Sequence, residues 1–144
     1  MGLGVALTEN AKGLAIFAKT ITMLADKKLK AFAATTNPQK AKAFYQDVLG
    51  LELLSEDDFA VQFNCNGGYL RVTTVQQLTP QSFTVLGWSV PDIYETIQHL
   101  TAKGVVFERY GFLEQDEAGV WTAPGGTKIA WFKDPDGNVL SLDC

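Results

Sequence analysis

The chain has 144 residues, of which 47% are hydrophobic and 19% are charged, and its formal net charge is −4. This length suits one compact domain or two small modules that share a core, and the composition is that of a globular chain. The negative charge argues against nucleic acid as a partner, and no apolar run is long enough to cross a membrane. With only two cysteines, no disulfide framework is expected, and we expect a cytoplasmic protein.

The first 26 residues differ from the rest of the chain. Their polar residues interrupt the apolar stretches, and no positively charged region comes first, which is not typical of a signal peptide. A loose apolar stripe predicts a helix over residues 2–26; it consists of Leu14, Ile16, Phe17, Ile21 and Leu24. We expect residues 1–26 to form an N-terminal helical extension that packs on its own domain or on a partner. An upstream start codon is the alternative, since Met23 lies just before the body of the chain.

The body begins with a strand, a helix and three further strands. Residues 30–36 predict a strand, and Asn37-Pro38 is a typical helix start, with Asn as the N-cap and Pro in the first turn. Gly50 ends the helix. Three strands are then predicted, over residues 51–54, 60–65 and 69–75. A linker of residues 76–81 follows.

The same plan then repeats. Residues 83–90 predict a strand, Pro91-Asp92 opens a helix, and Gly104 closes it. Three more strands are predicted, over residues 105–108, 128–133 and 139–142. The duplicated β-α-β-β-β order predicts an α+β fold with module one over 29–75 and module two over 83–143.

A long insertion, residues 111–126, precedes the last hairpin. Long irregular loops in compact domains often act as lids over a functional site. The alternative is a structural flap whose Trp121 fills the core, because tryptophan is usually buried.

Two apolar runs near the end flank the turn Asp134-Pro135-Asp136-Gly137-Asn138, which predicts a β-hairpin. The pattern Phe132-x-Asp-Pro-Asp-Gly-Asn resembles the closing hairpin of the glyoxalase / bleomycin-resistance / extradiol dioxygenase superfamily, also called the vicinal oxygen chelate superfamily. A second resemblance is to the first helix of that superfamily and the residues that follow it, and it rests on Phe44-Tyr45 and Leu49-Gly50-Leu51. The resemblance covers residues 29–142. It implies paired βαβββ modules that form a cupped mixed sheet, a ligand in the concave face, and a homodimer.

The resemblance also implies where a metal would be held, on the first and fourth strands of each module. These positions fall on Lys30, Arg71, the neighbourhood of Val85, and Ser141, none of which is a typical ligand for a divalent metal. The single histidine, His99, lies in a predicted helix. We therefore expect no family metal site and no cofactor, which disfavours glyoxalase, epimerase and extradiol-cleaving activity.

The candidate ligand-binding residues are cup-facing polar groups and strand aromatics, namely Lys30, Phe32, Arg71, Trp88, Trp131 and Ser141. Arginine in a cavity favours a carboxylate or phosphate, so an anionic small molecule is the expected partner. The alternatives are a solvated strand end for Lys30, an edge-strand ion pair for Arg71, and core packing for the aromatics. We interpret Cys65 as a small hydrophobic residue.

The main functional hypothesis is a metal-free small-molecule binding protein, with no catalytic residue assigned. A glyoxalase- or dioxygenase-type enzyme with an altered active site is the second hypothesis. A non-catalytic interaction module is the third. Metal dependence would distinguish the second hypothesis from the other two.

Overall fold

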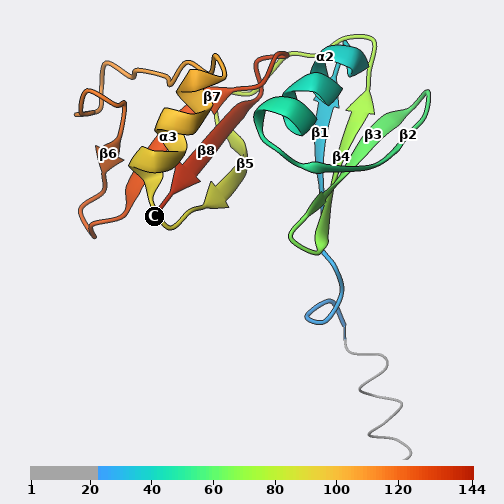
Figure 1. Cartoon of the computed structure of the whole chain (residues 1–144), viewed down its shortest axis with the longest axis horizontal. Helices are drawn as coiled ribbons and strands as arrows, with labels where there is room; N and C mark the ends of the chain where they lie inside the picture. Colours follow the sequence, from blue (N-terminus) through green and yellow to red (C-terminus); the bar gives the residue numbers. More distant parts are fainter. Residues whose placement is uncertain (1–22) are drawn as a thin grey trace, which may run out of the picture.

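The structure is a computed structural model that describes residues 23–144 (Figure 1). Its elements are β1 (Lys30–Thr35), α2 (Pro38–Ala43), the π-helical turn η1 (Phe44–Val48), β2 (Glu52–Glu56), β3 (Ala60–Cys65), β4 (Gly68–Thr74), β5 (Thr84–Ser89), α3 (Ile93–Ala102), β6 (Trp121–Thr122), β7 (Lys128–Lys133) and β8 (Val139–Asp143). Most of the predicted helix over 2–26 lies outside the described residues. Residues 23–26 belong to a turn in which the Lys27 N–H donates to the Leu24 carbonyl.

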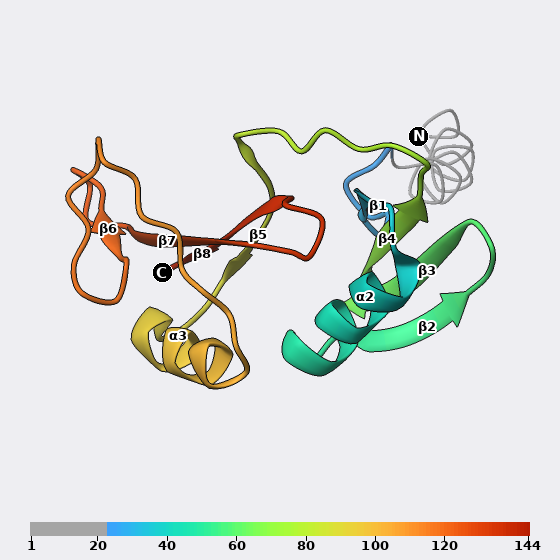
Figure 2. The ribbon, with the colours of Figure 1, turned by 90° about the horizontal axis from the view of Figure 1, so that it is seen from above.

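The chain forms two four-stranded mixed sheets, which confirms the α+β fold. Their strand orders are β1-β4-β3-β2 and β5-β8-β7-β6. The first strand of each module is parallel to the last, and the other pairs are antiparallel. Figure 2 shows α2 and α3 on the same side of the two sheets. No helix between residues 23 and 144 is long and apolar enough to span a membrane.

The helices begin where their capping residues predict. The Asn37 Oδ1 accepts a hydrogen bond from the Lys40 N–H at 3.1 Å, and Asp92 caps α3 through the N–H groups of Tyr94 and Glu95. The end of the first helix widens into η1, where the Leu49 N–H donates to the Phe44 carbonyl. This turn places Tyr45, which is fully buried, against the core.

One apolar core extends through both modules on the helix side of the sheets. Its largest fully buried side chains are Tyr45, Phe63, Phe132, Leu70, Ile93 and Leu140. Burial of each such side chain stabilises the fold by about 1.5–3 kcal/mol. The shared core holds the two modules in one body and leaves the other face of each sheet free for a site.

One predicted strand is wrong. Residues 105–108 form no strand, although the Glu108 N–H donates a backbone hydrogen bond to the Trp131 carbonyl of β7. The edge beside β7 is instead β6, which comes from the predicted insertion and pairs Trp121 with Ile129. Val105 is buried and Val106 is 79% exposed, so burial alternates as in a strand, but the backbone of this segment joins no ladder.

The insertion itself is held by its own side chains. Gln115 donates to the carbonyls of Glu108 and Gly119 and accepts from the Tyr110 N–H. The Arg109 guanidinium donates to the carbonyls of Asp116 and Glu117. Gly119 and Val120 are the buried residues of this segment, and Trp121 is only partly buried.

The turn between β7 and β8 joins the two modules. The Asp136 carboxylate accepts hydrogen bonds from the Thr35 hydroxyl at 2.5 Å and from the N–H and hydroxyl of Thr36. The Asn138 amide donates to the Ala34 carbonyl at 2.9 Å. The motif that predicts a hairpin therefore also fastens module two to the end of β1.

A buried part of the same joint lies beneath this turn. The Tyr45 hydroxyl donates to the Asp134 carboxylate at 2.7 Å, and the Asn138 amide donates to the same group. Burial, together with the negative charge of Asp134, raises the pKa of Tyr45 far above its ordinary value. The phenol therefore stays a proton donor to Asp134.

Candidate functional site

The face of the sheets opposite α2 and α3 is called the cup face here. In module one it carries Lys30 and Phe32 on β1 and Tyr69 and Arg71 on β4, because the buried neighbours Leu70 and Val72 point the other way. Lys30 is paired with Tyr69, and Phe32 is paired with Arg71. Three predicted site residues, Lys30, Phe32 and Arg71, therefore lie together, with Tyr69 beside them.

Positive charge gathers around Tyr69. The Nζ atoms of Lys28 and Lys30 lie 5.5 and 5.7 Å from the centroid of the Tyr69 ring, within the range of a cation–π interaction. The Lys28 ammonium is also 3.5 Å from the Tyr69 hydroxyl. With Arg71 on the same strand face, this half of the cup face favours a negative ligand group.

Module two supplies a row of aromatic rings. The ring centroids of Trp121 and Trp131 are 6.2 Å apart, those of Trp131 and Tyr110 are 5.5 Å apart, and those of Tyr110 and Phe112 are 5.6 Å apart. Burial and the nearby Glu108 raise the pKa of Tyr110, so its hydroxyl is a neutral hydrogen-bond donor. The Trp131 indole N–H donates to the Thr84 hydroxyl at 3.2 Å, which fixes the orientation of the ring.

Ser141 lies between this aromatic row and β5. It is paired with Trp131 on one side and with Gly87 on the other. A Cβ atom at Gly87 would come within 2.6 Å of the Ser141 hydroxyl oxygen. Because Gly87 has no side chain, it leaves space on the cup face for the Ser141 hydroxyl. The sequence predicts Ser141 at this face.

The linker between the modules crosses the cup face and separates two cavities. One, of about 380 Å³, is lined by Phe32, Thr73 and Val85 together with Leu78–Gln81. The other, of about 350 Å³, is lined by Tyr110, Lys133 and Val139 together with Pro80–Ser82. Both volumes lie in the range of small-molecule pockets.

Trp88 does not face the cup, contrary to the expectation that it lines the same site as Arg71. It is paired with Leu142, which is 3% exposed, and it packs against the core on the helix side. The cause is an irregularity in β5, where the pairing shifts between Thr84 and Leu86. Such a bulge moves every later side chain of the strand to the opposite face.

The positions where the resemblance implies metal ligands do not fit a divalent cation. Lys30 and Arg71 carry positive charge, Val85 is apolar, and Ser141 offers one hydroxyl. Among residues 23–144 no three histidine, cysteine, aspartate or glutamate side chains are close enough to form a metal site. No reaction step is therefore assigned to a metal here.

A duplicated βαβββ chain with helices on one face of two mixed sheets defines a recognisable class of protein. A family model described as Glyoxalase/Bleomycin resistance protein/Dioxygenase superfamily matches residues 28–142. The chain belongs to this superfamily. A search of curated proteins found no match.

Solved structures show the same fold at low sequence identity. A lactoylglutathione lyase from Agrobacterium tumefaciens is 18% identical, with a TM-score of 0.65 over 82% of this chain and 92% of that one. A superfamily member from Sphaerobacter thermophilus is 23% identical, with a TM-score of 0.66 over 84% and 98%. TnmS3, an antibiotic-binding protein from a Streptomyces species, is 21% identical, with a TM-score of 0.61 over 84% and 97%.

The sequence pattern does not indicate three members of the aromatic row, Tyr110, Phe112 and Trp121. Tyr110 and Trp121 come from segments without a regular period, so no pattern assigns them to a face. Trp121 was weighed only as a core residue or as part of a lid. The signal that could have indicated them is the concentration of aromatic residues beside a long insertion.

Proposed function

We propose that the protein binds a small anionic aromatic molecule on its cup face without a metal. The observation that carries this proposal is the division of the face, with Lys28, Lys30 and Arg71 in one module and the row of Tyr110, Trp121 and Trp131 in the other. Flat rings stack on such a row, and a carboxylate or phosphate pairs with the cations.

One structure with the same fold is that of an antibiotic-binding protein. The main support for binding comes from the implied metal positions of this chain, two of which hold the cations Lys30 and Arg71, and these suit a ligand anion better than a metal. A structure of a lyase is also similar. Metal content after incubation with zinc, nickel, iron and manganese tests this alternative, since about one retained metal per chain would contradict the metal-free proposal.

The binding test compares 2-naphthoate with its uncharged analogue 2-naphthylmethanol by isothermal titration calorimetry. We expect Arg71→Ala to weaken the carboxylate by more than about tenfold, the scale of a lost charge-assisted hydrogen bond, and to change the alcohol little. Lys40→Ala is the matched control, because it removes an exposed cation from α2 on the other face of the sheet. Equal effects of the two variants would show that Arg71 does not bind the carboxylate.

The proposal includes a cytoplasmic homodimer. Within residues 23–144 the outer strand β2 is paired only with β3, and the apolar side chains Leu54 and Phe59 are exposed close to this edge. Such edges are commonly covered by a second copy of the chain. Sedimentation at micromolar concentration would give a mass near twice 15.7 kDa, and a single-chain mass would contradict it.

A further inference from the structure

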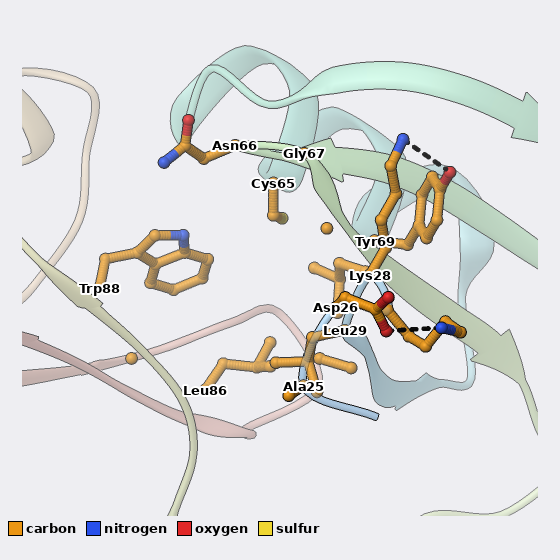
Figure 3. Close-up of a pocket in the computed structure, with 15 residues that line it drawn as sticks. Ala25, Asp26, Lys28, Leu29, Cys65, Asn66, Gly67, Tyr69, Leu86 and Trp88 are labelled. Atoms are coloured by element: carbon orange, nitrogen blue, oxygen red, sulfur yellow. Dashed lines mark hydrogen bonds and ion pairs between the residues drawn. The ribbon is translucent and has the colours of Figure 1, made fainter. Parts of the chain in front are cut away.

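The two sheets meet at a seam between β1 and β5 that is fastened at one end only. Each of these strands pairs only inside its own sheet, β1 with β4 and β5 with β8. The turn with Asp136 and Asn138 fastens the end of β1. At the other end, the strands diverge around a cavity of about 630 Å³, where residues 86–88 face the start of β1 (Figure 3).

This seam cavity lies beside the proposed cup site and shares only Lys28 and Tyr69 with its cationic part. Its apolar wall is formed by Leu29, Ala31, Cys65, Leu70, Leu86 and Trp88. Most of these side chains belong to the helix-facing set, since Leu70 is buried in the core and Cys65, Leu86 and Trp88 pack against it. A second, smaller cavity of about 170 Å³ adjoins Trp88 and is lined by Leu100 and Phe132. Arg71 and Trp131 line neither cavity.

The polar groups of the seam cavity favour an uncharged ligand. The Asp26 carboxylate is paired with the Lys27 ammonium at 2.5 Å, and the Lys28 ammonium is engaged with Tyr69. The Asn66 side chain, by contrast, makes no hydrogen bond within residues 23–144. Figure 3 shows the Trp88 indole extending toward the turn that carries Asn66 and Cys65. A ligand there meets an aromatic plane, aliphatic walls and one free amide.

We propose that the seam cavity is a second binding site, for a neutral, largely apolar ring compound that packs on Trp88 and hydrogen-bonds to Asn66. The volume is within the 300–1,000 Å³ that small-molecule sites occupy, and interfaces between modules are a preferred place for them. The proposal does not depend on the proposed function, because Trp88 and Asn66 lie outside the cup site, and neither Arg71 nor the aromatic row lines this cavity. Burial raises the pKa of the Cys65 thiol, so the cysteine serves as wall and reporter and not as a nucleophile.

The first experiment uses the full chain with Cys144→Ser, which leaves Cys65 as the only thiol, since the chain has two cysteines. The probe is N-phenyl-1-naphthylamine, a neutral amine with a naphthyl and a phenyl group whose emission rises in apolar sites. We expect saturable binding of one probe per chain and at least a fivefold slower reaction of Cys65 with dithiodipyridine at saturation. Unchanged thiol reactivity at saturation would overturn the proposal.

A set of variants then shows which site binds the probe. Cys65→Phe fills the cavity and should weaken binding at least tenfold, whereas Arg71→Ala and Trp131→Phe should leave it within twofold. The thiol-protection result stands even if Cys65→Phe fails to fold, because Cys144→Ser alters no wall residue. Loss of probe binding in Trp131→Phe with intact thiol reactivity would assign the probe to the cup face and contradict a seam site. Failure here leaves the binding of 2-naphthoate at Arg71 unaffected, so the two proposals fail separately.

Discussion

Two tyrosine hydroxyls of this chain donate to aspartate carboxylates in very different surroundings. Tyr45 is fully buried and donates to Asp134 at 2.7 Å, whereas Tyr94 is 39% exposed and donates to Asp116 at 2.6 Å. The hydrogen-bond lengths are similar, so the difference in stabilisation comes from burial. A buried carboxylate that loses its hydrogen-bond donor cannot form a replacement hydrogen bond with water, whereas an exposed carboxylate can.

Substitution of the two tyrosines by phenylalanine tests this difference. We expect Tyr45→Phe to lower the free energy of unfolding by about 1.5–3 kcal/mol, the range for hydrogen bonds to charged groups. Tyr94→Phe removes the same atoms and should cost less than about 1 kcal/mol, as exposed interactions with charged groups do. Urea unfolding of both variants gives the comparison. Equal losses would show that the joint at Asp134 is not tightened by burial.

The charge of the Asp57 carboxylate stabilises a turn. Its carboxylate accepts from the N–H groups of Phe59 and Ala60 at 2.8 and 2.9 Å, between β2 and β3. These backbone hydrogen bonds hold the pKa of Asp57 below its ordinary value. Since the folded pKa is lower than the unfolded one, this contribution is complete above the unfolded pKa and is lost as the pH falls through the folded pKa.

We therefore expect the Asp57 carboxyl to titrate below the ordinary aspartate pKa, about 3.9, in a carbon-detected NMR titration. Asp57→Asn keeps an oxygen acceptor for the turn but cannot titrate. Its free energy of unfolding should therefore fall less steeply than that of the natural chain below about pH 4. Identical acid slopes would mean that Asp57 binds protons equally in the folded and unfolded chains.

At the scale of the element, β5 shows what a sequence pattern can and cannot predict. The strand was predicted over residues 83–90 and is observed at Thr84–Ser89, because its apolar and β-branched residues favour extended backbone. The face of each side chain was not predictable, since one irregular pairing after Thr84 reverses the alternation. Lys30, Phe32, Arg71, Trp131 and Ser141 lie on strands without such a shift before them, and their faces agree with the expectation.

In the second sheet, the sequence predicts β7 correctly but not the edge strand beside it. Residues 128–133 were predicted as a strand and form β7 with the same bounds, since the flanking turn and the buried alternation agree. The neighbouring edge was assigned to residues 105–108, but β6 occupies it. A strand of two residues is too short to show an alternation of apolar and polar residues in the sequence. The position of β6 depends instead on contacts within the insertion, such as those of Gln115.

At the scale of the whole molecule, the joint between the modules should determine whether they unfold together. The Asp136 carboxylate ties the turn of module two to Thr35, which is fully buried, and to Thr36. All three tryptophans, at positions 88, 121 and 131, belong to module two. Tryptophan fluorescence therefore reports module two and, through Trp88 at the seam, its contact with module one, whereas far-ultraviolet circular dichroism reports the whole chain.

We expect the two signals to give one urea transition for the natural chain and separate midpoints for Asp136→Ala, because the variant leaves the Thr35 hydroxyl without its acceptor and weakens the joint. Asp58→Ala, an exposed aspartate in the turn between β2 and β3, is the control and should keep coincident curves. Coincident curves for Asp136→Ala would show that the shared core alone couples the modules.

The division of the cup face between the modules has a consequence for how such a chain can diversify. In the proposed site, one copy of the βαβββ plan meets the ligand charge through β1 and β4, and the other meets the ring through β6, β7 and the insertion. A mutation that alters charge preference therefore leaves ring selection intact, and the reverse also holds. The repeated plan therefore separates two traits that a single module would have to combine.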